Sequence, residues 1–271
     1  MIGVSLFFPL WFVAAHLCGG LGVALAAHLS TVALLALFVE FGWHWLRASR
    51  LARFVGRSLM RVRVGGELLE LDSRRQYIFA CEPHGPAALH LCFLFAAHGD
   101  LAMHEKMARR TVVMGHWLLV LLPFVCQLFQ LCGVMFSWRA TVDRALDRRS
   151  HVALCPSGIA GKVDAITRSF EPHTIVIRRR ERFGFIALAA RKNAVIVPVL
   201  SPDENSALTT IHWLCFAAGL TSKCDVAMRI GKPIDTCSLD SLTQTKLDKI
   251  ASLYYEALVE LAGDDYKIEF E

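Results

Sequence analysis

One histidine, His84, stands in a local sequence suited to proton transfer. The segment Glu82-Pro83-His84-Gly85-Pro86 follows the apolar run 77–81, which predicts a buried strand, and precedes 87–97, which predicts a helix. The positive end of a helix dipole disfavours an imidazolium ion, so the ring stays neutral and can accept a proton near pH 7. Gly85 leaves room for a substrate beside the ring. Position alone also allows a second interpretation, a histidine that stabilises the turn.

A second group of side chains is suited to phosphate. Arg178, Arg179, Arg180 and Arg182 follow the predicted strand 174–177, and guanidinium groups bind phosphate through paired hydrogen bonds. The same arginines would also suit a solvated surface. Together they predict a site for a nucleotide-like carrier, with the solvated face as the alternative.

Several other chemistries lack their sequence patterns. The chain has no G-x-S-x-G motif, no Walker A motif and no Rossmann glycine pattern. Its nine cysteines form no CxxC pair, and its histidines match no metal-binding spacing. We therefore expect no bound metal and no disulfide framework.

The predicted elements alternate between strands and helices. Strands are expected at 77–81, 152–155, 174–177, 194–200 and 226–230, and a helix at 183–192. A last helix is predicted from the capping box Ser241-x-x-Gln244, and Gly263 closes it. Its apolar stripe consists of Leu247, Ile250, Tyr254, Leu258 and Leu261. This order predicts an α/β fold with a largely parallel central sheet and flanking helices.

The first 39 residues contain no charged side chain. Gly19, Gly20 and Gly22 divide this run into two arms near the lower length limit for crossing a bilayer. Six arginines and no acid follow between residues 47 and 63, and the first four are spaced for one helix face. This excess of positive charge beside the apolar run predicts that the stretch lies in the cytosol. We therefore predict a transmembrane or re-entrant helical hairpin over 1–45 and one cytosol-facing domain over 46–271.

A second uncharged stretch covers residues 111–138, where Pro123 and Gly133 interrupt it. Its length would permit a span, but Gln127 and Gln130 make a regular lipid-exposed helix unfavourable. We expect a buried or membrane-dipping helical pair. The whole chain is 55% hydrophobic and 20% charged with a net charge of +5, which suits a membrane surface or phosphate-bearing ligands.

A series of motifs resembles the diacylglycerol acyltransferase type 2 family. Glu82-Pro83-His84-Gly85 is similar to the family's His/Glu-Pro-His-Gly signature, and Pro156-Ser157-Gly158 to its Pro-Gly-Gly turn. Further similar segments are 133–143, Arg182-Phe183-Gly184-Phe185, 197–205 and Gly231-Lys232-Pro233-Ile234. Leu89 stands five residues after His84, so the His-x4-Asp pattern of glycerol-phosphate acyltransferases is absent.

The resemblance implies transfer of a fatty acyl group from acyl-CoA to a lipid hydroxyl, with diacylglycerol as acceptor and triacylglycerol as product. His84 would be the general base, supported by Glu82. The remaining site residues implied by the resemblance would hold the coenzyme A part of the donor (Arg180, Arg182, Gly184, Gly158) or line the acceptor site (Pro83, Gly85, Glu204, Asn205).

The resemblance also implies partners and a location. The partners are acyl-CoA as cosubstrate, a neutral-lipid acceptor and the bilayer, with no permanently bound cofactor, no metal and no nucleic acid; a homo-oligomer is left open. The location is the endoplasmic reticulum membrane, with the lipid droplet surface as an extension. Monoacylglycerol, a fatty alcohol (giving a wax ester) or a lysophospholipid is an alternative acceptor.

A non-catalytic lipid-binding protein of the droplet surface is the alternative to an enzyme. Two departures from the family pattern motivate it. Gly161 stands where the family's turn usually carries Glu, and the segment between Asn205 and Gly231 is short.

Overall fold

Continuous apolar runs form the centre of the main sheet. In the computed structural model these are β2 (Tyr77–Glu82), β5 (His151–Leu154) and β7 (Val195–Leu200), and every residue of β2 and β7 is buried. Strands buried on both faces are typical of a parallel sheet covered by helices. The residues that the structure describes are 17, 19–36, 60–65, 71–72, 74–83, 110–117, 120, 126, 130, 133–158, 173–177, 184–202, 224–236 and 243–270.

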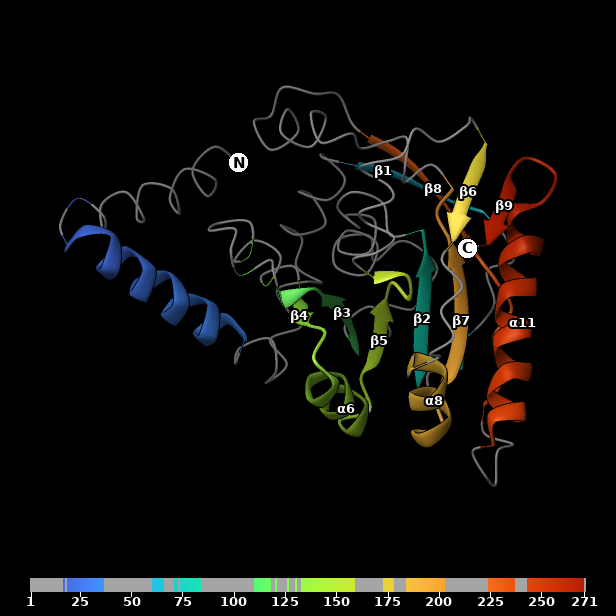
Figure 1. The fold of residues 1–271 in the computed structure, drawn as a ribbon, viewed down its shortest axis with the longest axis horizontal. Coiled ribbons are helices and arrows are strands. Elements are labelled where there is room, and N and C mark those ends of the chain that lie inside the picture. Colours follow the sequence, from blue (N-terminus) through green and yellow to red (C-terminus); the bar gives the residue numbers. More distant parts are fainter. Residues whose placement is uncertain are drawn as a thin grey trace.

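Within the described residues, the main sheet has seven strands in the order β1-β8-β7-β2-β5-β3-β4 (Figure 1). The other four are β1 (Met60–Gly65), β3 (Thr111–Gly115), β4 (Val134–Phe136) and β8 (Cys224–Ile230). The five strands from β7 to β4 are parallel to one another, which confirms the predicted α/β class with mostly parallel strands. The sheet also contains one antiparallel pair, because β8 is antiparallel to β7 and pairs in parallel with β1.

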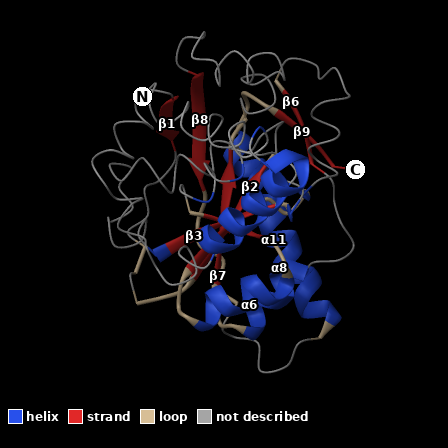
Figure 2. Ribbon diagram, turned by 90° about the vertical axis from the view of Figure 1, so that its left-hand side faces the viewer, coloured by secondary structure: helices blue, strands red, loops and turns tan. Residues whose placement is uncertain are grey.

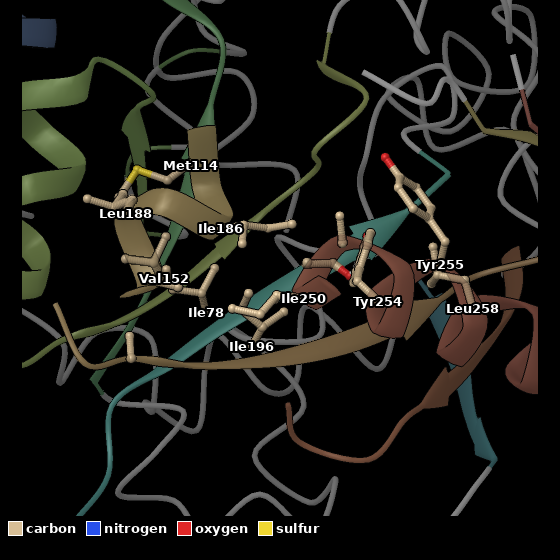
Figure 3. Packing of buried hydrophobic residues seen from close by; sticks show 14 of the residues in the cluster. Ile78, Met114, Val152, Ile186, Leu188, Ile196, Ile250, Tyr254, Tyr255 and Leu258 are labelled. Carbon is tan, nitrogen blue, oxygen red and sulfur yellow. Dashed lines mark hydrogen bonds between the residues drawn. The ribbon is translucent and has the colours of Figure 1, made fainter. Parts of the chain in front are cut away.

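In the part of the chain that the structure describes, three helices cover one face of this sheet (Figure 2). They are α6 (Arg139–Asp147), α8 (Gly184–Arg191) and α11 (Gln244–Ala262). Ile78, Val152 and Ile196, from three adjacent strands, pack with residues of α8 and α11 in one hydrophobic cluster (Figure 3). Each fully buried isoleucine of this kind stabilises the fold by about 1.5–3 kcal/mol.

The last helix confirms its predicted stripe and corrects its predicted start. Ile250, Tyr254 and Leu258 are buried, and Gly263 ends the helix with φ 61°. The helix begins at Gln244 with Thr243 at the N-cap position and no side-chain cap hydrogen bond, so the expected capping box from residue 241 is wrong. The apolar face therefore determined this helix, and the cap motif did not mark its first residue.

A small parallel sheet joins two distant segments. The strand β6 (Thr174–Ile177) was predicted, but it pairs with β9 (Lys267–Phe270) and not with the main sheet. Arg229 of β8 anchors the turn before β9, because its guanidinium donates to the main-chain oxygens of Leu261 and Ala262 at 2.8 Å each. These contacts satisfy two carbonyls at the end of α11.

The N-terminal apolar run contains the helix Gly19–Ala36, which is long and apolar enough to cross a membrane by length and composition (Figure 1). Ala24, His28 and Val32 form its buried face, whereas Leu21, Leu25, Leu29 and Leu34 are exposed. The first predicted hairpin arm lies outside the described residues, so the hairpin stays a prediction.

Two side-chain contacts join this helix to the segment between β3 and β4. His28 Nε2 donates to the main-chain oxygen of Val120 at 2.8 Å, and Gln130 Nε2 donates to that of Val32 at 2.9 Å. The expectation for 111–138 therefore needs correction, because β3 and β4 lie at its two ends and are strands of the main sheet. Gln130 is buried against the helix and does not face lipid.

Candidate functional site

The site is built around a buried carboxylate, that of Glu82, at the last position of β2. The side chain is 1% exposed. Side chains alternate along a strand, so Glu82 shares the sheet face of Ile78 and Ala80, which α11 covers. A charged group in such surroundings is costly unless polar groups compensate it.

Ser157 supplies two such groups from the loop that follows the neighbouring strand β5. Its main-chain N–H donates to Glu82 Oε1 at 2.8 Å, and its hydroxyl donates to Glu82 Oε2 at 2.7 Å. Ser157 is itself buried. Each carboxylate oxygen therefore has its own donor, and the orientation of the carboxylate is fixed.

The strand on the other side of β2 contributes Ser201. Its main-chain N–H donates to the main-chain oxygen of Glu82 at 2.7 Å, which extends the β2–β7 ladder by one residue. The Ser201 hydroxyl is fully buried and has no hydrogen-bond partner in the structure as described. Ends of three adjacent parallel strands thus meet at Glu82, at the edge of an α/β sheet where ligands usually bind.

Tyr254 of α11 covers the site from the helical face. Its hydroxyl donates to the main-chain oxygen of Ala80 at 3.4 Å. Burial raises the pKa of Tyr254 well above its usual value, and the negative charge of Glu82 raises it further. The phenol is therefore neutral over the physiological range. Phe185, at the start of α8, packs edge-on against it with ring centroids 5.4 Å apart.

The structure places four of the predicted site residues. Glu82 and Pro83 are buried at the end of β2 and are joined by a cis peptide bond. Gly158 has φ 54°, and its N–H donates to the Cys155 oxygen at 3.1 Å, so that N–H closes the turn. Gly184 begins α8 next to Phe185, on the helical side of the sheet that also covers Glu82.

The remaining predicted residues lie outside the described part of the chain. They are His84, Gly85, Arg180, Arg182, Glu204 and Asn205. Within the described residues, no group of three His, Cys, Asp or Glu side chains could hold a metal ion.

Two residues of this cluster were not predicted as site residues. Ser157 and Ser201 appear in the sequence only as parts of motifs. The available signal was positional, because each follows a predicted strand directly or within three residues, and strand ends of a parallel sheet converge.

A solved structure resembles the chain in fold. It is the crystal structure of the 1-acyl-sn-glycerophosphate (LPA) acyltransferase PlsC from Thermotoga maritima, with 14% sequence identity and a TM-score of 0.50. The match covers 86% of this chain and 97% of that one. The main sheet and its helices are therefore an acyltransferase-like fold.

The family is shown by a separate comparison. A model of the diacylglycerol acyltransferase family matches residues 39–221, which is more than half of the 271 residues. The chain belongs to the diacylglycerol acyltransferase family. Family and fold together support an acyltransferase of lipid biosynthesis.

Proposed function

We propose that this protein transfers a fatty acyl group from acyl-CoA to a lipid hydroxyl at a membrane surface, with diacylglycerol as acceptor and triacylglycerol as product. The observation that carries the proposal is the buried Glu82 carboxylate, which Ser157 holds through two hydrogen bonds. Glu82 stands two residues before His84, and the chain belongs to the diacylglycerol acyltransferase family. Within the described residues, Glu82 is the carboxylate that lies buried at the ligand-binding edge of the sheet.

The reaction needs one base and one path for the leaving group. His84 takes the proton of the acceptor hydroxyl while its oxygen attacks the thioester carbonyl carbon. The new C–O bond forms, the C–S bond breaks, and the coenzyme A thiolate leaves with the proton returned by His84. The thioester is already activated, so no acyl-enzyme is required. Glu82 stabilises the imidazolium that forms during the attack.

The remaining predicted residues take the other parts of the two substrates. Arg180 and Arg182 bind the coenzyme A phosphates near the start of α8, where Gly184 leaves open space around its Cα. Pro83, Gly85, Glu204 and Asn205 line the acceptor side. The reaction uses no metal and no permanently bound cofactor.

The membrane role follows from the N-terminal helix. Its exposed leucines suit hydrocarbon, while its buried face holds it against Val120 and Gln130. This arrangement attaches the sheet to the endoplasmic reticulum membrane, with the lipid droplet surface as a further location. There both lipid substrates are available to the site.

The test is expression of His84→Ala in cells that lack neutral-lipid synthesis, followed by lipid-class chromatography. We expect triacylglycerol from the wild type and a loss of about 1,000-fold or more in the variant. The control is His173→Asn, which suits the local φ of 64° and removes the imidazole, just before β6, that contacts the Tyr266 ring. It should leave product formation unchanged.

Other products would redirect the proposal. Diacylglycerol, wax ester or phospholipid would assign monoacylglycerol, a fatty alcohol or a lysophospholipid as acceptor. Absence of any acylated product from the wild type, with the protein present in membranes, would indicate a lipid-binding protein without catalysis. Near-normal turnover in His84→Ala would contradict the assigned base.

A further inference from the structure

We propose that Ser157 is a positioning residue for acyl transfer: its hydroxyl and main-chain N–H hold the Glu82 carboxylate ionised and in one orientation. Glu82 stands two residues before His84 in the sequence. The inference rests on the proposed function and assigns to Ser157 a task within that site. Ser157 acts through Glu82 and need not contact either substrate.

The geometry of the pair favours a fixed carboxylate. Two donors from one residue reach two different oxygens of Glu82, at 2.8 Å and 2.7 Å. Both side chains are almost completely buried, at 1% and 3% exposure. Two hydrogen bonds from one residue restrict rotation of the carboxylate plane, as paired hydrogen bonds do in other preorganised sites. The main chain of Ser201 fixes the strand end at the same residue, with 2.7 Å between its nitrogen and the Glu82 oxygen.

The two hydrogen bonds from Ser157 act on the charge of Glu82 as well as on its orientation. The negative charge of Glu82 acts on Tyr254 of α11, whose pKa is raised by burial and further by this charge. Burial disfavours the ionised carboxylate, whereas donors directed at its oxygens favour it. Loss of the Ser157 hydroxyl therefore shifts Glu82 toward its protonated form whatever the starting balance.

Protonation of Glu82 gives the pH dependence of acyl transfer a direction. A protonated Glu82 cannot stabilise the imidazolium, so activity falls when Glu82 takes up a proton. Ser157→Gly keeps the main-chain donor and removes the hydroxyl. We expect the acidic limb of the pH–rate profile to move upward by about one pH unit. The rate kcat at pH 7 should fall about tenfold with KM unchanged, because the pair acts on the base and not on the lipid.

The experiment compares variants of the full chain in membranes between pH 5 and 9. Ser157→Thr keeps a hydroxyl and should restore the wild-type profile. Ser137→Gly is the matched control, since Ser137 is exposed at the end of β4 on the same edge of the sheet. It makes the same chemical change without touching Glu82 and should leave the profile unchanged.

A double-mutant cycle separates positioning from a general structural role. In a Glu82→Gln background no carboxylate remains to be kept ionised, so adding Ser157→Gly should change kcat less than twofold. A wild-type pH profile in Ser157→Gly, or an equal loss of rate in both backgrounds, would overturn the inference. Thermal unfolding of each variant verifies folding, and Ser157→Ala replaces Ser157→Gly if the glycine variant fails to fold.

Failure of the proposed function would look different. If the wild type forms no acylated lipid with any acceptor, the proposed function is wrong. The Ser157–Glu82 contact can still be tested by its effect on the stability of the fold. In that case the midpoint pH of acid unfolding should be higher for Ser157→Gly than for wild type and for Ser137→Gly. An unchanged midpoint would overturn the Ser157–Glu82 assignment on its own.

Discussion

The two ends of the same three strands treat buried polar groups differently. At the amino ends of β2 and β5, His151 is fully buried, and its Nδ1 accepts from the Tyr77 N–H at 3.3 Å. Gln76, which is half-buried, precedes β2, and its amide donates to the main-chain oxygens of Leu146 and Ser150 at 2.7 Å and 2.9 Å. Gln76 thereby ties the end of α6 to the sheet. Both His151 and Gln76 are neutral near pH 7.

At the carboxyl ends the buried group is a carboxylate. Glu82 is held by Ser157 and Ser201 from the strands on either side. A neutral group that bonds to main-chain oxygens mainly contributes to folding, whereas a buried charge held by donors is costly and is retained where chemistry needs it. The difference supports the proposed placement of the reaction at the carboxyl ends of these strands, with the groups at the amino ends contributing to stability.

The largest expected effect comes from one substitution at each end of the strands, Glu82→Gln at the carboxyl end and Gln76→Ala at the amino end. Glu82→Gln keeps the shape and an acceptor oxygen for the Ser157 N–H, and its amide nitrogen can donate to the Ser157 hydroxyl, but the charge is removed. We expect acyl transfer to fall about 1,000-fold, because the imidazolium loses its counterion, while the free energy of unfolding changes by less than about 1 kcal/mol. Initial rates in membranes and unfolding midpoints measure the two quantities.

The matched variant at the other edge is Gln76→Ala. It removes the two amide contacts and should lower the free energy of unfolding by about 2 kcal/mol, with the rate per folded molecule unchanged. If Gln76→Ala lost catalysis or Glu82→Gln mainly lost stability, the assignment of the two edges would be reversed.

The next effect concerns pH and the amino edge. Burial, assisted by the positive charge of Arg110, lowers the pKa of His151 from 6.5 to about 4. The unfolded chain therefore binds a proton more readily, and His151 contributes stability that is complete above pH 6.5 and is lost as the pH falls toward 4. The total is about 3 kcal/mol, with about 2 kcal/mol lost by pH 5.

His151→Asn keeps an acceptor for Tyr77 and cannot titrate. The variant should lose less stability than wild type between pH 7.5 and pH 5, as measured by denaturant unfolding at the two pH values. Equal acid losses in both proteins would show that the folded protein protonates His151 as readily as the unfolded chain does, and that its pKa is not lowered. The rate at pH 7 should be unchanged, since His151 lies at the edge away from Glu82.

The centre of the fold could be predicted because its signals are local. The strands β2, β5 and β7 are continuous apolar runs, and the observed ends differ from the predicted ends by one residue. The strand β1 was not predicted, because Arg61 and Arg63 were counted only as part of the basic stretch 47–63, although they alternate with apolar residues. The direction of β8 depends on pairing with distant strands, which no local pattern records.

The candidate site divides in the same way. Glu82 could be predicted from its place after an apolar run, since strand ends of parallel sheets bind ligands. The contact between Glu82 and Ser157 joins residues 75 positions apart in the chain. It depends on β2 and β5 being neighbours, so it follows from the topology and from no spacing in the sequence.

The smallest expected effect concerns the Ser201 hydroxyl, which is buried without a partner in the described structure. Ser201→Ala removes no hydrogen bond to Glu82, because the Ser201 contact uses the main-chain N–H. Burying an unpaired hydroxyl is unfavourable, so the free energy of unfolding should stay the same or rise by up to about 1 kcal/mol. A fall of more than about 1 kcal/mol would mean that the hydroxyl has a partner. A loss of rate without a loss of stability would assign Ser201 to the catalytic site together with Glu82, as a hydroxyl that forms a hydrogen bond to a substrate oxygen.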